Sequence, residues 1–308
     1  MKHETAGDPM SGLKWTRKTT EKIASELRTV GIGVSPNTVG RLLKQMGYSL
    51  RVNHKQLARV CKIAPEDRDA QFTHIAQLRK HCAARALPLI SVDTKKKELI
   101  GRFKNPGAAW NREPVVVKDH DFLSEADAKA VPYGIYDVLA NRGTIYVGTS
   151  IDTAEFAIDA IEAWWLSEGR HRYDGAKELA ILADGGGSNG STNRLWKHHL
   201  QHQIAKQYGL TVTVAHYPPG ASKWNPIEHR LFSEVSKNWA GRPLDSFETV
   251  LNYIRTTKTK TGLEVRAHLL DRHYDRGVKI DDATMHDLSI TWHASLPRWN
   301  YVLSPGSI

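Results

Sequence analysis

The sequence has few cysteines and no long apolar run. Its 308 residues include only two cysteines, Cys61 and Cys82, which form neither a disulfide framework nor a metal-ligand spacing. No stretch of about 18 apolar residues occurs, and no signal peptide is recognisable. These absences argue against a disulfide-rich secreted protein and against a protein with membrane-spanning helices. We therefore expect a soluble, cytoplasmic protein with no membrane partner.

Positive charge is in excess, and most of the excess lies near the start of the chain. The net charge is +10, and residues 1–60 hold eleven Lys and Arg against four Asp and Glu. A basic region of this kind indicates a polyanionic partner, most simply nucleic acid, which would associate the protein with the DNA of the cell. A solvated basic face without any ligand is the alternative.

The basic region contains a pattern typical of two short helices. A helical pattern begins at Thr20, breaks at residues 31–33 and resumes after Ser35, which can cap a second helix ending at Gly47. Two helices joined by a glycine-containing turn predict a helix-turn-helix, although an ordinary helical hairpin has the same pattern. The residues expected to face a DNA groove are Asn37, Thr38, Arg41 and Lys44.

The rest of the chain predicts an α/β domain. After a helix over residues 65–86, strand-like runs and helices follow in the order βββ-α-β-α-β-α, which is the order of the ribonuclease-H-like fold. The expected first and second strands are 88–93 and 97–103. The third is either of the runs 133–140 and 144–150, or both as one bent ribbon, and the fourth and fifth are 179–183 and 210–215. We thus predict a mixed five-stranded sheet with flanking helices. The predicted domains are a helix-turn-helix region with a basic linker (1–64), a catalytic domain (65–270) and an extension packed on it (271–308).

Three acidic residues stand at comparable places in this predicted fold. Asp93 ends the first strand, Asp184 ends the fourth, and Glu228 opens the helix after the fifth. Converging carboxylates without Cys or His suit Mg²⁺ or Mn²⁺, and a pair of such ions can activate an attacking oxygen and stabilise a leaving oxygen in phosphodiester chemistry. Each acid also has a structural alternative. Asp93 could begin a turn, Asp184 could bond its glycine loop, and Glu228 could complete a capping box with Asn225.

The glycine loop after Asp184 matches a dinucleotide-binding motif only in outline. Gly185, Gly187 and Gly190 have the required spacing, but an acid directly precedes the first glycine and no acid ends the next strand, where His216 stands. We instead expect the glycines to let a nucleic-acid backbone approach Asp184. The histidines form no compact set for zinc.

Several side chains near the three acids could contact DNA. His216 and His229 could touch DNA or water, and a structural role is equally consistent with their positions. The cations and the aromatic residue that could hold phosphates or stack on bases are Lys95, Lys96, Lys97, Lys223, Trp224 and Arg230. A solvated face is the alternative for the lysine run.

Three segments resemble one known family closely. VDTKKKELIGRFKN (92–105), LADGGGSNGSTNRLWK (182–197) and PPGASKWNPIEHRLFSEVSKNW (218–239) are similar to the Rhodopirellula-type DDE transposases of bacterial insertion sequences, distant relatives of the mariner-like transposases. The likeness runs from about Leu13 to Tyr301. Residues 1–12 do not match the further helical sequence expected ahead of Leu13, which is consistent with a truncated or decayed copy.

The resemblance implies a DDE-type polynucleotidyl transferase. Asp93, Asp184 and Glu228 would be the catalytic acids and would bind divalent metal ions. Water would cut phosphodiesters at the element ends, and the freed 3′-hydroxyl would attack target DNA at the same site. The N-terminal helices would hold the terminal inverted repeats, with the protein acting as a homo-oligomer on DNA. The alternatives are an inactive or truncated DNA-binding protein and a nuclease of the same fold that cuts without joining.

Overall fold

The computed structural model describes residues 5–7, 14–16, 18–49, 63–109 and 111–306. Contacts divide the chain into two compact units, Met1–Leu57 and Ala58–Ile308. Cys61 and most of the predicted basic linker lie outside the described residues. Within the described part of the chain, no helix is long and apolar enough to cross a membrane.

The N-terminal unit contains the two predicted helices, α1 (Thr20–Thr29) and α2 (Pro36–Gln45). Ser35 caps α2 as expected, because its side chain accepts a hydrogen bond from the Thr38 backbone N–H at 3.1 Å. The helices bury Ile23, Ala24 and Val39 between them. Two short antiparallel strands, β1 (Thr5–Gly7) and β2 (Lys14–Thr16), precede them.

The second unit is built on one sheet whose centre has the predicted order. The five central strands are β3 (Leu89–Thr94), β5 (Ala128–Asp137), β6 (Arg142–Gly148), β7 (Glu178–Ala183) and β8 (Thr211–His216). They run in the order β6-β5-β3-β7-β8. The β3–β5 and β5–β6 pairs are antiparallel, whereas β3–β7 and β7–β8 are parallel. This mixed arrangement is the ribonuclease-H-like fold expected from the sequence.

The structure shows which segments of the chain form the second and third strands of the sheet. The hairpin of β5 and β6 supplies both, and Asn141 adopts the left-handed conformation (φ 52°) in its turn. The run 97–103 forms only a short strand, β4 (Glu98–Ile100), which pairs with β5 and not with β3. It cannot serve as the second strand because the longer, almost fully buried β5 already occupies that edge of β3.

The sheet extends beyond the five predicted strands at both edges. On one side β9 (Glu264–Leu270) runs parallel to β6. On the other, β11 (Asn300–Leu303) pairs with β8 and with β10 (Ile290–Trp292). Strand β9 alternates buried and exposed residues at its start, as an edge strand with one solvated face does.

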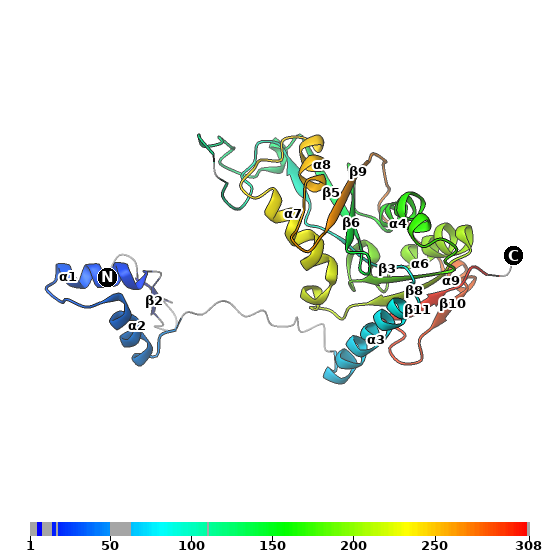
Figure 1. Ribbon diagram of the computed structural model, residues 1–308, viewed down its shortest axis with the longest axis horizontal. Coiled ribbons are helices and arrows are strands. Elements are labelled where there is room, and N and C mark those ends of the chain that lie inside the picture. Colours follow the sequence, from blue (N-terminus) through cyan, green and yellow to red (C-terminus); the bar gives the residue numbers. More distant parts are fainter. Residues whose placement is uncertain (1–4, 8–13, 17, 50–62, 110, 307–308) are drawn as a thin grey trace. The chain divides into compact units, whose positions relative to one another are not determined.

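Helices cover both faces of the sheet (Figure 1). On one face, α4 (Ala154–Trp164) and α6 (Arg194–His199) pack over Ile90 and Val92 of the central strand. On the other face lie α3 (Pro65–Ala84), α7 (Ser233–Asn238) and α8 (Phe247–Arg255). Three π-helical segments continue or precede these helices: Trp165–Gly169, Leu200–Lys206 and Glu228–Phe232. The remaining helical pieces are α5 (Arg170–Arg172), α9 (Asp282–His286) and the 3₁₀ turns Leu123–Glu125, Gly187–Asn189 and Ser222–Trp224.

Candidate active site at the ends of the central strands

Asp93 and Asp184 lie at the same edge of the sheet because their strands are parallel neighbours. Val92 of β3 stands in register with Ala183 of β7, so the next residue of β3, Asp93, lies beside Asp184, the residue that follows β7. Asp93 Oδ1 accepts a hydrogen bond from the Thr94 backbone N–H at 2.8 Å, and Asp184 Oδ1 accepts one from the Gly186 N–H at 2.9 Å. The structure therefore brings these two predicted acids together.

Glu228 approaches from a helix that packs closely on the strands. The helix begins at Pro226, and its first turns lie over Gly134 and Gly143, where an added Cβ would stand 2.4 Å from Phe232 and 2.4 Å from Leu231, respectively. Gly134 is the register partner of Asp93. Bare glycine backbone thus allows the segment that carries Glu228 to approach the strand next to Asp93.

Asn225 does not act as the helix cap that the sequence predicts. Its Oδ1 accepts a hydrogen bond from Ser91 Oγ at 2.5 Å, and both residues are buried. A buried serine hydroxyl on β3 needs an acceptor, and the asparagine amide provides it. The side chain expected to begin the helix instead fastens the helix start to the strand that ends in Asp93.

Burial and mutual repulsion disfavour charge on all three acids. Burial raises the pKa of Asp93 to about 8, and the neighbouring charges of Asp184, Glu228 and Asp152 act in the same direction. Burial also raises the pKa of Asp184, and burial together with the charge of Asp184 raises that of Glu228. These carboxylates form an oxygen-only, electron-rich donor set, which fits a hard divalent cation.

The acids are coupled through their charges but do not form a ready-made coordination cage. In the part of the chain that the structure describes, no three His, Cys, Asp or Glu side chains converge closely enough to hold a metal ion. The two observations are compatible because charge–charge interaction extends much further than the 2.0–2.6 Å or so of a metal–oxygen bond.

A pocket of about 430 Å³ opens beside Asp93 and Asp184, and it contains a further acid, Asp152, that the sequence did not single out. Asp152 lies just before α4 and is a residue type that often caps helices, but the cap is Thr153, whose side chain accepts from the Phe156 N–H at 3.2 Å. Asp152 Oδ1 accepts instead from Thr94 Oγ1 at 3.1 Å. Adjacent Asp and Thr are both good caps, so the sequence alone could not distinguish their roles.

The predicted cations are divided between this pocket and the surrounding surface. Lys95, Lys96 and Lys97 line the pocket. Lys95 is engaged elsewhere, because its ammonium lies 2.7 Å from Glu98 and 4.5 Å from the centre of the Trp239 ring. Lys97 lies 3.8 Å from Asp152 and is about half exposed.

The other predicted contacts do not line the pocket. Trp224 is 47% exposed, with the Lys223 ammonium 3.9 Å from its ring centre, and Arg230 is exposed. On α2, Asn37, Arg41 and Lys44 are exposed, whereas Thr38 is partly occupied with its own helix cap.

The two histidines near the acids differ sharply. His229 is exposed, and its Nε2 contacts the Lys223 carbonyl oxygen. His216 is fully buried, and burial lowers the pKa of its imidazole to about 4. Its ring lies between the Asp184 carbonyl and the Tyr301 hydroxyl.

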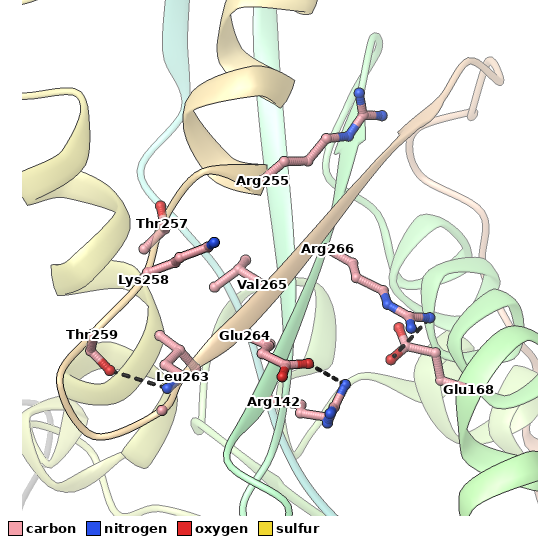
Figure 2. Close-up of a pocket in the computed structure, with 12 residues that line it drawn as sticks. Arg142, Glu168, Arg255, Thr257, Lys258, Thr259, Leu263, Glu264, Val265 and Arg266 are labelled. Carbon is pink, nitrogen blue, oxygen red and sulfur yellow. Dashed lines mark hydrogen bonds and ion pairs between the residues drawn. The ribbon is translucent and has the colours of Figure 1, made fainter.

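A second pocket, of about 480 Å³, lies where β6 and β9 begin, away from the strand ends that carry the acids (Figure 2). Arg142, Arg255, Lys258 and Arg266 line it together with Glu168 and Glu264. Most of its arginines are already engaged: Arg142 pairs with Glu264 at 2.5 Å, and Arg255 donates to the Ala267 carbonyl. It is a basic surface feature with no acid in a catalytic arrangement.

The order and direction of the central strands are those of the ribonuclease-H-like fold. The chain belongs to the Rhodopirellula transposase DDE domain family, whose sequence profile matches residues 1–305. This confirms the resemblance found in the sequence. The match includes residues 1–12, which we had expected to differ from the family. A DDE family of this kind implies use of a divalent metal. A search of curated proteins gave no match.

Solved structures of the Mos1 transposase are similar in fold at low identity. The Mos1 paired-end complex with the left transposon end matches with 16% identity and a TM-score of 0.45, covering 77% of this chain and 65% of that chain. The Mos1 strand transfer complex matches with 15% identity and a TM-score of 0.45, covering 77% and 64%. The Mos1 mariner paired-end complex with Mn matches with 16% identity and a TM-score of 0.42, covering 77% and 65%. The chain thus spans about 65% of the length of these Mos1 chains.

Proposed function

We propose that this protein is a DNA transposase of an insertion sequence, which cleaves and joins phosphodiesters at the element ends. The observation that carries the proposal is the placement of Asp93 and Asp184 on adjacent parallel strands, with Glu228 brought to the same edge by a closely packed helix. Family membership over residues 1–305 supports it. The proposed partners are the terminal inverted repeats and target DNA, bound by a homo-oligomer.

The catalytic residues in this proposal are Asp93, Asp184 and Glu228, which would hold Mg²⁺ or Mn²⁺, two ions in all. When bound, such ions activate the attacking oxygen and stabilise the leaving oxygen of a phosphodiester displacement. The carboxylates must be ionised to serve as ligands. Their raised pKa values therefore couple metal binding to loss of protons.

The surrounding residues would position the DNA. Lys96 and Lys97 at the pocket would neutralise phosphate charge, and the loop at Gly186 and Gly187 leaves open space, since an added Cβ there meets nothing within 4 Å. The contact along the DNA strand would be extended by Lys223, Trp224 and Arg230. The element ends would be recognised by Asn37, Thr38, Arg41 and Lys44. The exposed Trp224 ring offers a face for base stacking.

The proposed reaction has two displacements at one site. Water attacks a phosphodiester at the element end, the bond from phosphorus to the 3′-oxygen breaks, and a 3′-hydroxyl and a 5′-phosphate result. That 3′-hydroxyl then attacks a target phosphodiester and displaces the target's own 3′-oxygen. The number of phosphodiester bonds is conserved in the second step, so joining needs no external energy source.

The test uses Asp184→Asn and Glu228→Gln with DNA ends taken from the inverted repeats that flank the gene. Both variants should lose Mg²⁺-dependent cleavage by at least about 10³-fold and still bind the ends. Glu234→Gln, in the same helical segment, is the matched control. It should cleave normally, because Glu234 pairs with Lys237 and is not one of the proposed metal ligands. Normal cleavage by both site variants would refute the assignment.

Three further outcomes separate the alternatives. Strand transfer with pre-cut ends distinguishes a transposase from a nuclease that does not join. If Glu228 only stabilised the start of its helix, Glu228→Gln would lower the free energy of unfolding by at most about 1 kcal/mol, and the variant would still cleave DNA. Binding without any cleavage by the wild-type protein would favour a DNA-binding role.

A further inference from the structure

His216 is fully buried, and each of its four polar groups has a partner. Its backbone N–H donates to the Trp299 carbonyl at 2.9 Å, and its own carbonyl accepts from Gln71 Nε2 at 2.8 Å. In the ring, Nδ1 lies 2.9 Å from the Asp184 carbonyl oxygen, and Nε2 lies 3.2 Å from the Tyr301 hydroxyl. The residue therefore joins α3, β8 and β11 to the loop that carries Asp184.

The partners of the ring allow only one arrangement of protons. The Asp184 carbonyl can only accept, so Nδ1 must carry the hydrogen. The Tyr301 hydroxyl hydrogen has no other acceptor among the described residues, so it is donated to Nε2, which accepts it. The Tyr301 oxygen in turn accepts from the indole N–H of Trp196 at 2.9 Å, and that group can only donate. One directed chain runs from Trp196 through Tyr301 and His216 to Asp184.

The chain ends on the main chain of a proposed metal ligand. The preceding carbonyl, that of Ala183, accepts from the Tyr217 N–H at 2.8 Å, and the Asp184 carboxylate itself accepts from the Gly186 N–H at 2.9 Å. The carbonyl groups of Ala183 and Asp184 are thus hydrogen-bonded to Tyr217 and His216, respectively. The backbone at Asp184 therefore has little conformational freedom. The direction of the carboxylate is then set by its side-chain torsions alone.

We propose that His216 is a positioning residue for Asp184, and that Tyr301 of β11 fixes its tautomer. The Nδ1–H bond holds the Asp184 main chain so that its carboxylate faces Asp93, and the C-terminal strand is thereby coupled to the metal-binding edge. This inference rests on the proposed function, because it presupposes that Asp184 binds a divalent cation. Two buried amides reinforce the junction: Gln71 and Asn300 exchange hydrogen bonds at 2.7 and 2.6 Å.

Two isosteric variants separate positioning from mere packing. His216→Asn keeps an N–H close to the Nδ1 position, whereas His216→Gln places its amide nearer Nε2 and loses the donor to Asp184. Each removes one buried hydrogen bond, so both should lower the unfolding midpoint to a similar extent. Mn²⁺ binding to the DNA-free protein, followed by electron paramagnetic resonance, should weaken about 10–100-fold in His216→Gln and stay near wild type in His216→Asn. Equal affinities in the two variants would overturn the proposal.

A measurement on the wild-type protein guards against variants that do not fold. Nitrogen-15 NMR of the ring should show a protonated Nδ1 and an unprotonated Nε2 for His216, assigned in the wild-type protein through its proximity to the Tyr301 ring. A protonated Nε2 would overturn the proposal. Asp184→Asn distinguishes the two hypotheses: if it binds Mn²⁺ as wild type does, the proposed metal role fails, whereas the tautomer result is independent of it.

Discussion

Asp93 is a residue whose surroundings disfavour its own charge. Burial is the largest cause of its raised pKa of about 8, followed by the charge of Asp184, and the Thr94 N–H only partly offsets them. Such an arrangement is costly in a protein without a bound cation and becomes favourable when a cation is bound. The ionised Asp93 side chain therefore lowers the stability of the cation-free protein and favours the binding of a cation.

Asp93→Asn should stabilise the protein in the presence of EDTA. The folded form holds its proton up to a pH of about 8, whereas the unfolded carboxyl releases it near 4, so between these values the folded state binds more protons and wild-type stability falls as pH rises. At pH 8 the variant should melt about 2–4 °C higher than wild type, and the difference should shrink towards pH 4. Asp119→Asn, at a side chain that is 92% exposed, is the control. A lower melting temperature at pH 8 would contradict this account.

Cys82 should be unreactive in the folded protein. It is 1% exposed, and burial raises the pKa of its thiol to about 11. The thiolate is the reactive form, so alkylation at pH 8 should be at least about 100-fold slower in the folded protein than in urea. Mass spectrometry of the peptide containing Cys82 measures both rates, and similar rates in the two conditions would show that the thiol is accessible.

At the scale of single elements, the central strands can be predicted from the sequence more readily than the loops and helical segments that connect them. Strands β3, β7 and β8 are short, largely apolar runs at the centre of the sheet, and their positions follow from the sequence. The start of β5 was missed because residues 104–132 carry no clear period. The π-helical segment Glu228–Phe232 leaves no sign in the sequence, since its apolar spacing also suits an α-helix.

The roles of polar side chains near the site depended on contacts between distant parts of the chain. Three acids at strand ends and a helix start could be singled out from their positions. Asp152 could not, because its neighbour Thr153 is an equally good cap. The bond from Ser91 to Asn225 joins residues 134 positions apart, and no local pattern announces such a pair.

The Ser91–Asn225 bond should stabilise the helix that carries Glu228. Asn225 Nδ2 already lacks a partner among the described residues, so Ser91→Ala would leave the whole buried amide unpaired. We expect a loss of about 1–3 kcal/mol in urea unfolding. Ser167→Ala, at an exposed serine on the opposite side of the sheet, should cost about 0.5 kcal/mol or less. Equally small losses of unfolding free energy in the two variants would show that the Ser91–Asn225 hydrogen bond does not stabilise the protein.

At the scale of the whole second unit, its C-terminal strands complete the sheet. Strand β11 covers the edge of β8, and Tyr301, Leu303 and Trp299 bring apolar side chains into the interior. The sequence predicts only that residues 271–308 pack on the catalytic domain. It could not reveal strand pairing, because runs of three and four residues are too short to show a period.

Removal of residues 290–308 should abolish cooperative folding of this unit. The deletion exposes the edge of β8 and leaves the Trp196 indole N–H, His216 Nε2 and Gln71 Oε1 without partners, each at a cost of about 1–3 kcal/mol. Urea unfolding followed by tryptophan fluorescence should lose its sharp transition. Tyr301→Phe, which removes one hydroxyl, should only lower the midpoint. An unchanged transition after the deletion would show that the extension is dispensable.

The pairing of β11 with β8 also has a consequence for synthesis on the ribosome. Strand β8 is translated before residues 217–299, yet its outer edge and Nε2 of His216 find their partners only when β11 has been added. A nascent chain therefore carries all three acids while β8, which supports the Asp184 main chain, still has an open edge. The acidic edge of the sheet would reach its final arrangement only after β11 has left the ribosome.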